Sequence, residues 1–330
     1  MRIDRTVAPS YIDREGVTAM KRRWLMMLLL SLILAGCAGK EQVFELNTDR
    51  IREDTVYLCR EIGIRVTETP EETDTADWIF SSLLEAGFEE GKSLHRQGFS
   101  GAKGGASENV IALCNADSDG PIISVVAHFD SVATSLGARD NAASVAALLE
   151  MARYLGAENG ELSCQIRLVF LGSEENGYHG SAAYVANLTA EEKSRHLGAF
   201  NMDISAASDG EEAQLVCNNL GAVTDGQYTE GNFIVPAEGA LIEAIRQAYR
   251  ELYGKELGGV FHFGESDHVS FHNVGIEAAN VCWRKVSGGM PVLPESYHKM
   301  EDTPEELNYE TVRASARCIL RAMEIMTGNR

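Results

Sequence analysis

Two short, mostly apolar stretches of the chain restrict the fold more than any other feature. One is Ile122–Ala127, bounded by Pro121 and His128, and the other is Gln165–Leu171. Strands that are apolar on both faces are buried on both faces, which is typical of parallel sheets covered by helices. The two stretches therefore predict central strands of an α/β sheet.

The rest of the chain supports this fold class. Amphipathic periodicity or capping signals predict helices over 48–62, 72–87, 141–155, 178–188, 237–253 and 304–327. Further strands are expected at 93–99, 108–114, 199–204, 214–217 and 276–283. Strands that alternate with helices predict an α/β fold with a mostly parallel central sheet and helices on both faces. Because no break in composition divides residues 48–330, we expect them to form a single domain.

The N-terminal region has the features of an export signal. Lys21–Arg23 precede the apolar run Trp24–Ala35, which is too short to span a bilayer because spanning takes about 20 residues. A basic start, a short apolar run and small residues are typical of a secretory signal. The run ends at Cys37 in Leu-Ala-Gly-Cys, which resembles a bacterial lipoprotein box. A plain signal peptide with an unrelated cysteine is the alternative.

These features predict the organisation of the N-terminal region. We expect residues 1–36 to be a signal segment and residues 37–47 a tether lipidated at Cys37. The protein would then be exported and anchored by lipid to a bacterial membrane. Met20 begins a complete signal by itself, and Arg14–Gly16 can be encoded by purine-rich codons that resemble a ribosome-binding site. We therefore expect translation to start at Met20.

Charge and cysteine content exclude other classes of protein. The chain has 29 basic and 49 acidic residues, a net charge of −20, so it lacks the basic surface that nucleic-acid binding needs. Export permits disulfides. The six cysteines other than Cys37 mostly lie in apolar runs, however, so we expect buried free thiols.

Polar clusters follow the points where the predicted strands end. In chain order they are His128–Asp130, Asp140–Asn141, Glu174–Glu175, Asp203 and Tyr297–His298. Each cluster is a weak signal alone. Ligands of open α/β sheets bind beyond the carboxyl ends of the strands, so these clusters are expected to meet there. Two histidines with several carboxylates suit a pair of zinc ions, which would also neutralise the buried charge.

The order of these motifs resembles a known family, the co-catalytic zinc exopeptidases. These include bacterial secreted aminopeptidases and are related to glutamate carboxypeptidase and glutaminyl cyclase. The segments that carry the resemblance are His128–Val132, Gly137–Asn141, Glu174–Ser181, Asp203, Ser266–His268 and Tyr297–Thr303. The resemblance extends from about residue 48 to the end. The resemblance implies a zinc-exopeptidase-like fold of the phosphorylase/hydrolase-like type. It also implies that the protein hydrolyses peptides.

The resemblance also implies a role for each residue of the motifs. His128 and Asp203 would bind one zinc ion, Glu175 and His298 the other, and Asp140 would bridge the two. Glu174 would be the general base that activates a bridging water. Asp130 would orient His128, and Tyr297 would help to stabilise the oxyanion. In relatives the peptide bond after the bridging aspartate is often cis, so we expect a cis Asp140–Asn141 bond, although Ser144 departs from the usual sequence.

Other readings of the sequence stay open at this point. A glutaminyl-peptide cyclase shares the fold but works with one zinc ion, and an aminoacylase-type enzyme carries an inserted domain that is not evident here. A non-catalytic, peptide-binding lipoprotein is the third alternative. An aminopeptidase is favoured over a carboxypeptidase because Asn280 and Cys282 stand where some carboxypeptidases have arginines.

The Asp302-Thr303-Pro304 sequence is expected to cap the last helix, with Thr303 as N-cap.

Overall fold

The computed structural model describes residues 44–156, 163–219, 239–262 and 265–328. The chain divides into two units, Met1–Phe44 and Glu45–Arg330. The predicted signal segment, Cys37 and the tether up to residue 43 lie outside the described residues. Within the described part, no helix combines the length and the apolar character needed to cross a membrane.

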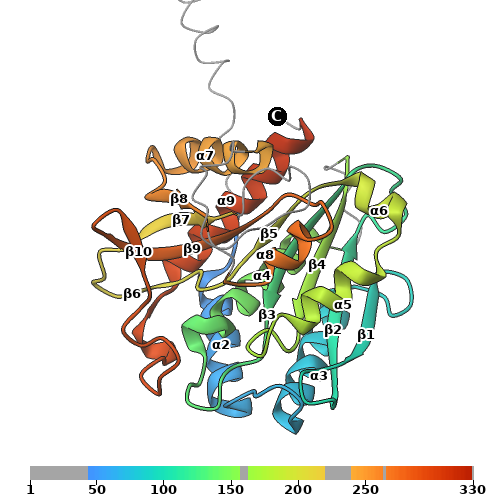
Figure 1. Ribbon diagram of the computed structural model, residues 1–330, viewed down its shortest axis with the longest axis horizontal. Coiled ribbons are helices and arrows are strands. Elements are labelled where there is room, and N and C mark those ends of the chain that lie inside the picture. Colours follow the sequence, from blue (N-terminus) through green and yellow to red (C-terminus); the bar gives the residue numbers. More distant parts are fainter. Residues whose placement is uncertain (1–43, 157–162, 220–238, 263–264, 329–330) are drawn as a thin grey trace, which may run out of the picture. The chain divides into compact units, whose positions relative to one another are not determined.

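The unit Glu45–Arg330 is built on a nine-stranded sheet in the order β1-β2-β4-β3-β5-β9-β7-β8, with β10 paired to β9 (Figure 1). Its strands are β1 (Leu94–Ser100), β2 (Ala106–Cys114), β3 (Ile122–His128), β4 (Gln165–Leu171), β5 (His196–Asn201), β7 (Gln214–Asn218), β8 (Gly259–Phe261), β9 (Ala278–Ser287) and β10 (Met290–Val292). β6 (Ala207–Ser208) and β11 (Leu307–Asn308) form a second, two-stranded sheet. All residues of β3 and β4 are buried, as the mostly apolar sequences of the two strands predict, and this includes the polar residues Ser124, His128, Gln165 and Arg167.

Helices cover both faces of the large sheet (Figure 1). They are α2 (Thr48–Tyr57), α3 (Pro70–Glu85), α4 (Ala143–Leu155), α5 (His179–Asn187), α6 (Ala190–Arg195), α7 (Ala240–Tyr253), α8 (His268–His272) and α9 (Tyr309–Thr327), with π-helical turns at Leu58–Ile62 and Ala138–Ala142. α4 packs between β3, α2 and α9, whereas α5 and α8 pack together against the opposite face. There Val126, Val169 and Phe271, each fully buried, belong to an apolar cluster.

The predicted α/β class is confirmed, but the sheet is mixed rather than mostly parallel. β3 pairs in parallel with β4 and β5, and β5 with β9 and β7 with β8 are also parallel. The pairs β1–β2, β2–β4, β7–β9 and β9–β10 are antiparallel. Short loops join β1 to β2 and β9 to β10, and a short loop can connect only antiparallel neighbours, whereas β2–β4 and β7–β9 are antiparallel pairs of strands that are not consecutive in the chain.

The start of the last helix was predicted wrongly. α9 begins at Tyr309 with Asn308 as N-cap, whose Oδ1 accepts the amide N–H of Glu310 at 3.1 Å. Pro304–Glu306 instead form a separate 3₁₀ turn, and Thr303 makes no capping hydrogen bond. The chain is extended between the two because Leu307 and Asn308 pair with β6, a tertiary contact that overrides the local proline signal.

The six cysteines of the described chain are all buried and free, as predicted. Burial raises the pKa of each thiol for which a shift is resolved, including Cys59 and Cys282, both to about 11. Such thiols are protonated near neutral pH and unreactive, so they serve as small apolar core residues.

Candidate metal centre

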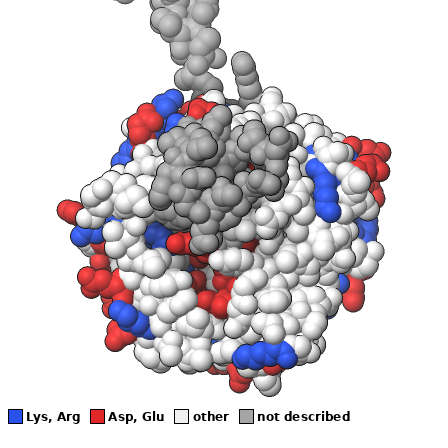
Figure 2. Space-filling model, in the orientation of Figure 1, with Lys and Arg blue, Asp and Glu red and all other residues white. Residues whose placement is uncertain are grey.

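Three neighbouring parallel strands bring the polar clusters to one edge of the sheet. β3 ends at His128 itself, β4 leads through a short turn to Glu174 and Glu175, and β5 leads to Asp203. Because β4, β3 and β5 are adjacent and parallel, their carboxyl ends lie side by side, as expected for an α/β ligand site. Figure 2 shows acidic side chains in a hollow near the centre of the face drawn.

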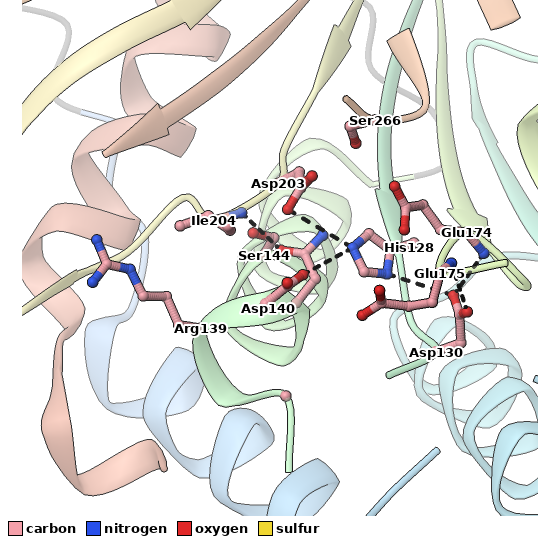
Figure 3. A network of polar contacts seen from close by, with 12 residues as sticks. His128, Asp130, Arg139, Asp140, Ser144, Glu174, Glu175, Asp203, Ile204 and Ser266 are labelled. Carbon is pink, nitrogen blue, oxygen red and sulfur yellow. Dashed lines mark hydrogen bonds and ion pairs between the residues drawn. The ribbon is translucent and has the colours of Figure 1, made fainter. Parts of the chain in front are cut away.

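Asp140 is at the centre of this cluster, between two histidines. Its Oδ1 lies 3.2 Å from Nε2 of His128, and its Oδ2 lies 3.4 Å from Nε2 of His298. Each imidazole also faces a second carboxylate: His298 Nε2 is 3.1 Å from Glu175 Oε2, and His128 Nε2 is 3.8 Å from Asp203 Oδ1. Figure 3 shows His128 between Asp140, Asp203 and the two adjacent glutamates.

The polar atoms of this cluster are placed to bind metal ions rather than to form hydrogen bonds with one another. His128 Nε2, His298 Nε2, Glu175 Oε1 and Asp203 Oδ1 are buried and lack hydrogen-bond partners. Single ligand atoms of His128, Asp140 and Glu175 lie within 4.8 Å of one another, and so do those of His128, Glu174 and Asp203. Unpaired buried polar atoms are costly, and imidazole nitrogens with carboxylate oxygens are the donors zinc prefers. The geometry therefore suits cation binding.

The electrostatics of the cluster point the same way. The carboxylates of Asp140 and Glu175 that face His298 raise the pKa of His298 to about 10, and burial raises the pKa of Glu175 to about 7. Burial lowers the pKa of His128, but Glu174 and three aspartates outweigh it and raise that pKa well above its usual value. In the absence of metal, the cluster thus retains protons at neutral pH. A dication would displace them.

Glu174 is in an environment different from that of Glu175. Its pKa is raised well above the ordinary value, because the side chain is buried and the charges of Asp267, Asp203 and Glu175 oppose its ionisation. Asp267 is itself fully buried, and burial raises its pKa to about 7. A carboxyl group with a raised pKa is suited to accept and return a proton near neutral pH.

Asp130 holds the two glutamates in place. Its Oδ1 accepts the amide N–H of Glu174 at 2.9 Å, and its Oδ2 accepts that of Glu175 at 3.1 Å (Figure 3). The separation between Asp130 Oδ1 and His128 Nδ1 is longer, 3.5 Å. Sequence reasoning anticipated only the contact with His128. The structure adds that one fully buried carboxylate connects the ends of β3 and β4.

The segment that carries Asp140 is also tightly fixed. The predicted cis peptide bond between Asp140 and Asn141 is confirmed. The Asn141 side chain donates to the carbonyl of Met202 at 2.8 Å and accepts the amide N–H of Ile204 at 3.3 Å, which joins this segment to the one that carries Asp203. Ser144, the departure from the family pattern, accepts the amide N–H of Ser205 at 3.4 Å.

Asp302 has a role that the sequence analysis missed. Its carboxylate accepts the amide N–H groups of Arg139 at 2.8 Å and Asp140 at 3.2 Å, so it holds the Asp140 segment instead of capping a helix. Its fixed position four residues after His298 in the Tyr-His motif was the available signal. Asn280 was also missed, and its Oδ1 accepts the amide N–H of Asp203 at 3.0 Å.

The centre is most open on the side of His298. The side chain of His298 is 33% exposed, whereas those of His128, Asp140, Glu175 and Asp203 are each exposed by less than a tenth. Tyr297 lies beside this opening, and its ring stacks on His298 with the centroids 3.7 Å apart. Burial, with the surrounding carboxylates, raises the Tyr297 pKa far above its usual value, so the phenol keeps its proton.

Known proteins resemble this chain in sequence. The model of peptidase family M28 matches residues 109–323. Aminopeptidase YwaD of Bacillus subtilis is 33% identical over 205 residues, which cover 61% of this chain and 40% of the relative. The probable lipoprotein aminopeptidase LpqL of Mycobacterium tuberculosis is 32% identical over 181 residues, 53% of this chain and 34% of the relative. The chain thus spans less than half the length of these relatives.

Solved structures share the fold. A zinc aminopeptidase from Bacillus subtilis superposes with a TM-score of 0.71 at 19% identity, covering 86% of this chain and 96% of that one. A glutaminyl cyclase from Bacteroides thetaiotaomicron superposes with a TM-score of 0.66 at 17% identity, covering 84% and 98%. With the family match extending over most of the chain, from β2 to α9, this protein belongs to peptidase family M28.

Proposed function

We propose that this protein is a zinc-dependent exopeptidase that uses two metal ions to release N-terminal residues from peptides. The observation that carries the proposal is the arrangement around Asp140, whose two carboxylate oxygens each face a different histidine at 3.2 and 3.4 Å. A carboxylate placed in this way can bridge two cations. The aminopeptidase names of the relatives in the same family support the activity.

The ligands divide into two sets around Asp140. His128 and Asp203 would hold one zinc ion, and His298 and Glu175 the other, since these are the pairs whose polar atoms approach each other. Glu174 also comes within 4.8 Å of the first pair. We assign it to proton transfer because five other donors already complete the two sets.

The residues then have distinct chemical tasks. Zinc ions in such a site lower the pKa of water and polarise the scissile carbonyl of the substrate. The Glu174 carboxylate takes a proton from the attacking water and delivers it to the leaving amine. The Tyr297 phenol, held beside His298, donates a hydrogen bond to the oxygen on which negative charge develops.

The surroundings favour the amino end of a peptide over its carboxyl end. Carboxylates crowd the centre, and three of them, Asp130, Glu174 and Asp267, are not among the proposed ligands. A free ammonium group would be attracted to this region, whereas a terminal carboxylate would be repelled. A substrate would enter beside His298, where the centre is open.

We further propose that the protein is exported and anchored to a membrane by lipid on Cys37. The support is the Leu-Ala-Gly-Cys sequence after a basic and apolar segment, together with the relative that is named a probable lipoprotein aminopeptidase. Anchoring that lasts needs more than one acyl chain, because a single chain gives only marginal binding.

A substrate panel tests the proposed activity. The purified protein is offered amino-acid anilides, the same compounds with a blocked amine, peptides with a blocked amine and a free carboxyl end, and a peptide with N-terminal glutamine. We expect hydrolysis only where the amine is free, and loss of hydrolysis on prolonged chelation. Pyroglutamate release from the glutamine peptide would instead identify a cyclase, and no turnover of any compound would favour a binding protein.

A further inference from the structure

Arg65 is a fully buried arginine in the segment between the π-helical turn Leu58–Ile62 and α3. It precedes the residues that match the family model, which begin at 109. The five hydrogen bonds that its guanidinium makes to described residues all end on backbone carbonyl oxygens. No carboxylate of the described residues forms an ion pair with this guanidinium. A buried charge without such a partner is costly, so the position needs a reason beyond packing.

The hydrogen bonds of the Arg65 side chain join the two ends of the loop that connects His128 to Asp140. Nε donates to the carbonyl of Phe129 at 2.8 Å, directly after His128 at the end of β3. Nη1 and Nη2 donate to the carbonyls of Leu136 at 2.9 Å and Gly137 at 3.1 Å, which lie shortly before Asp140. The planar guanidinium therefore connects the start of the loop to its end.

The loop is shaped to receive this side chain. Arg65 and Ser131 exchange two hydrogen bonds of 3.0 Å, since the Arg65 amide donates to Ser131 Oγ and the Ser131 amide donates to the Arg65 carbonyl. Gly137 has a φ of +60°, and a Cβ there would lie 2.9 Å from Arg65 Nη2 and 2.5 Å from the Asp140 carbonyl oxygen. Only glycine allows so close an approach in this conformation.

The remaining two hydrogen bonds connect the Arg65 guanidinium to the segment of residues 58–63, which precedes Arg65 in the chain. Nη1 also donates to the carbonyl of Gly63 at 2.7 Å and to that of Leu58 at 3.3 Å. The guanidinium of Arg65 therefore contacts the N-terminal segment and both ends of the loop between His128 and Asp140. Asp302 fixes the other side of Asp140 through the amide N–H groups of Arg139 and Asp140.

We propose that Arg65 is a positioning residue for the metal centre. By holding the carbonyls of Phe129, Leu136 and Gly137, it sets the distance between His128 and the bridging Asp140. This inference rests on the proposed two-metal function. It predicts that an altered Arg65 weakens metal binding in a protein that remains folded.

The test is Arg65→Lys, which keeps the charge but cannot make the same set of hydrogen bonds. Metal-free protein is titrated with Zn²⁺ against a chromogenic chelator, and its unfolding midpoint and its kcat and KM on an amino-acid anilide are also measured. We expect zinc affinity to fall about 10- to 100-fold, as is typical when groups behind metal ligands are changed. We expect kcat to fall and KM to change little.

Arg167→Lys is the matched control. Arg167 is a buried arginine of β4 that donates to Gln165 Oε1 at 2.7 Å and Glu192 Oε1 at 2.6 Å, toward the end of the strand away from the centre. Its replacement is expected to lower the unfolding midpoint and to leave zinc affinity and kcat unchanged. If Arg65→Lys behaves in the same way as this control, Arg65 is only structural and the proposal is wrong.

Two further outcomes are separated by the design. Should Arg65→Lys fail to fold, Ser131→Ala removes the hydroxyl that accepts the Arg65 backbone N–H and so loosens the attachment of Arg65 to this loop. This variant is expected to lower zinc affinity by a smaller factor, and unchanged affinity overturns the proposal. If the unaltered protein binds no zinc and hydrolyses nothing, the proposed function fails. If instead it binds zinc and Arg65→Lys binds it equally well, only the role of Arg65 fails.

Discussion

Replacement of Asp130 by asparagine is expected to damage both the fold and the metal centre. The Asp130 carboxylate accepts two backbone N–H groups, from Glu174 at 2.9 Å and Glu175 at 3.1 Å. An asparagine keeps one carbonyl oxygen, and its amide group would face the second N–H without accepting it. A hydrogen bond to a charged group contributes about 1.5–3 kcal/mol, so the free energy of unfolding of metal-free protein should fall by at least that amount.

The metal centre should be affected as well. Because Asp130 orients the peptide that carries both glutamates and faces His128 Nδ1 at 3.5 Å, zinc affinity is expected to fall about 10- to 100-fold. Denaturant unfolding with a chelator present measures the loss of unfolding free energy, and competitive zinc titration measures the loss of zinc affinity.

Asp77→Asn is the control for this experiment. Asp77 pairs with Arg96 at 2.8 Å on the surface, where its side chain is 61% exposed, and such pairs contribute only about 0–1 kcal/mol. If Asp130→Asn unfolds and binds zinc like this control, the inferred role of Asp130 is wrong.

Four other substitutions have defined outcomes. Glu174→Gln should keep both zinc ions and lower kcat by about 10²–10⁴-fold, whereas Glu175→Gln should weaken one metal site; the reverse pattern in a metal assay would exchange their roles. Burial raises the pKa of Glu72 to about 7, so its contribution to stability is present below about pH 4.5 and is lost as the pH rises through about 7. Glu72→Gln should therefore flatten the fall in unfolding free energy over that range, and an unchanged profile would contradict the assignment. Cys37→Ser should abolish lipid modification and release the protein from membranes, and an unmodified Cys37 in protein from its native host would exclude the lipid anchor.

Much of the fold was predictable because its central strands are mostly apolar. In Ile122–Ala127 only Ser124 is polar, and in Gln165–Leu171 only Gln165 and Arg167 are, so the burial of both strands between two layers of helices followed from sequence, whereas the burial of Arg167 did not. The direction of the outer strands did not follow, because strand pairing depends on contacts between distant residues. The start of α9 was missed for the same reason, since Leu307 and Asn308 pair with β6.

In the candidate site, too, local sequence motifs could be recognised, whereas contacts between residues far apart in the chain could not. The residues that converge on Asp140 could be named from motifs at strand ends and from the family resemblance. The contacts that hold these residues in place could not be predicted, apart from that of Asp130 with His128, because the partners are far apart in the chain. Asp130 contacts amides 44 and 45 positions away, and Asp302 contacts one 163 positions away. Arg65, outside the matched family region, had no motif to mark it.

The central claim, that Asp140 bridges two zinc ions, is tested most directly by reconstitution of metal-free protein. Zinc is added in increments while bound metal is counted by mass spectrometry under native conditions and hydrolysis of an amino-acid anilide is followed in parallel. The account predicts two zinc ions per chain, full activity only when both are bound, and loss of both ions from Asp140→Ala. Full activity without added metal, or saturation at a single zinc ion, would contradict it.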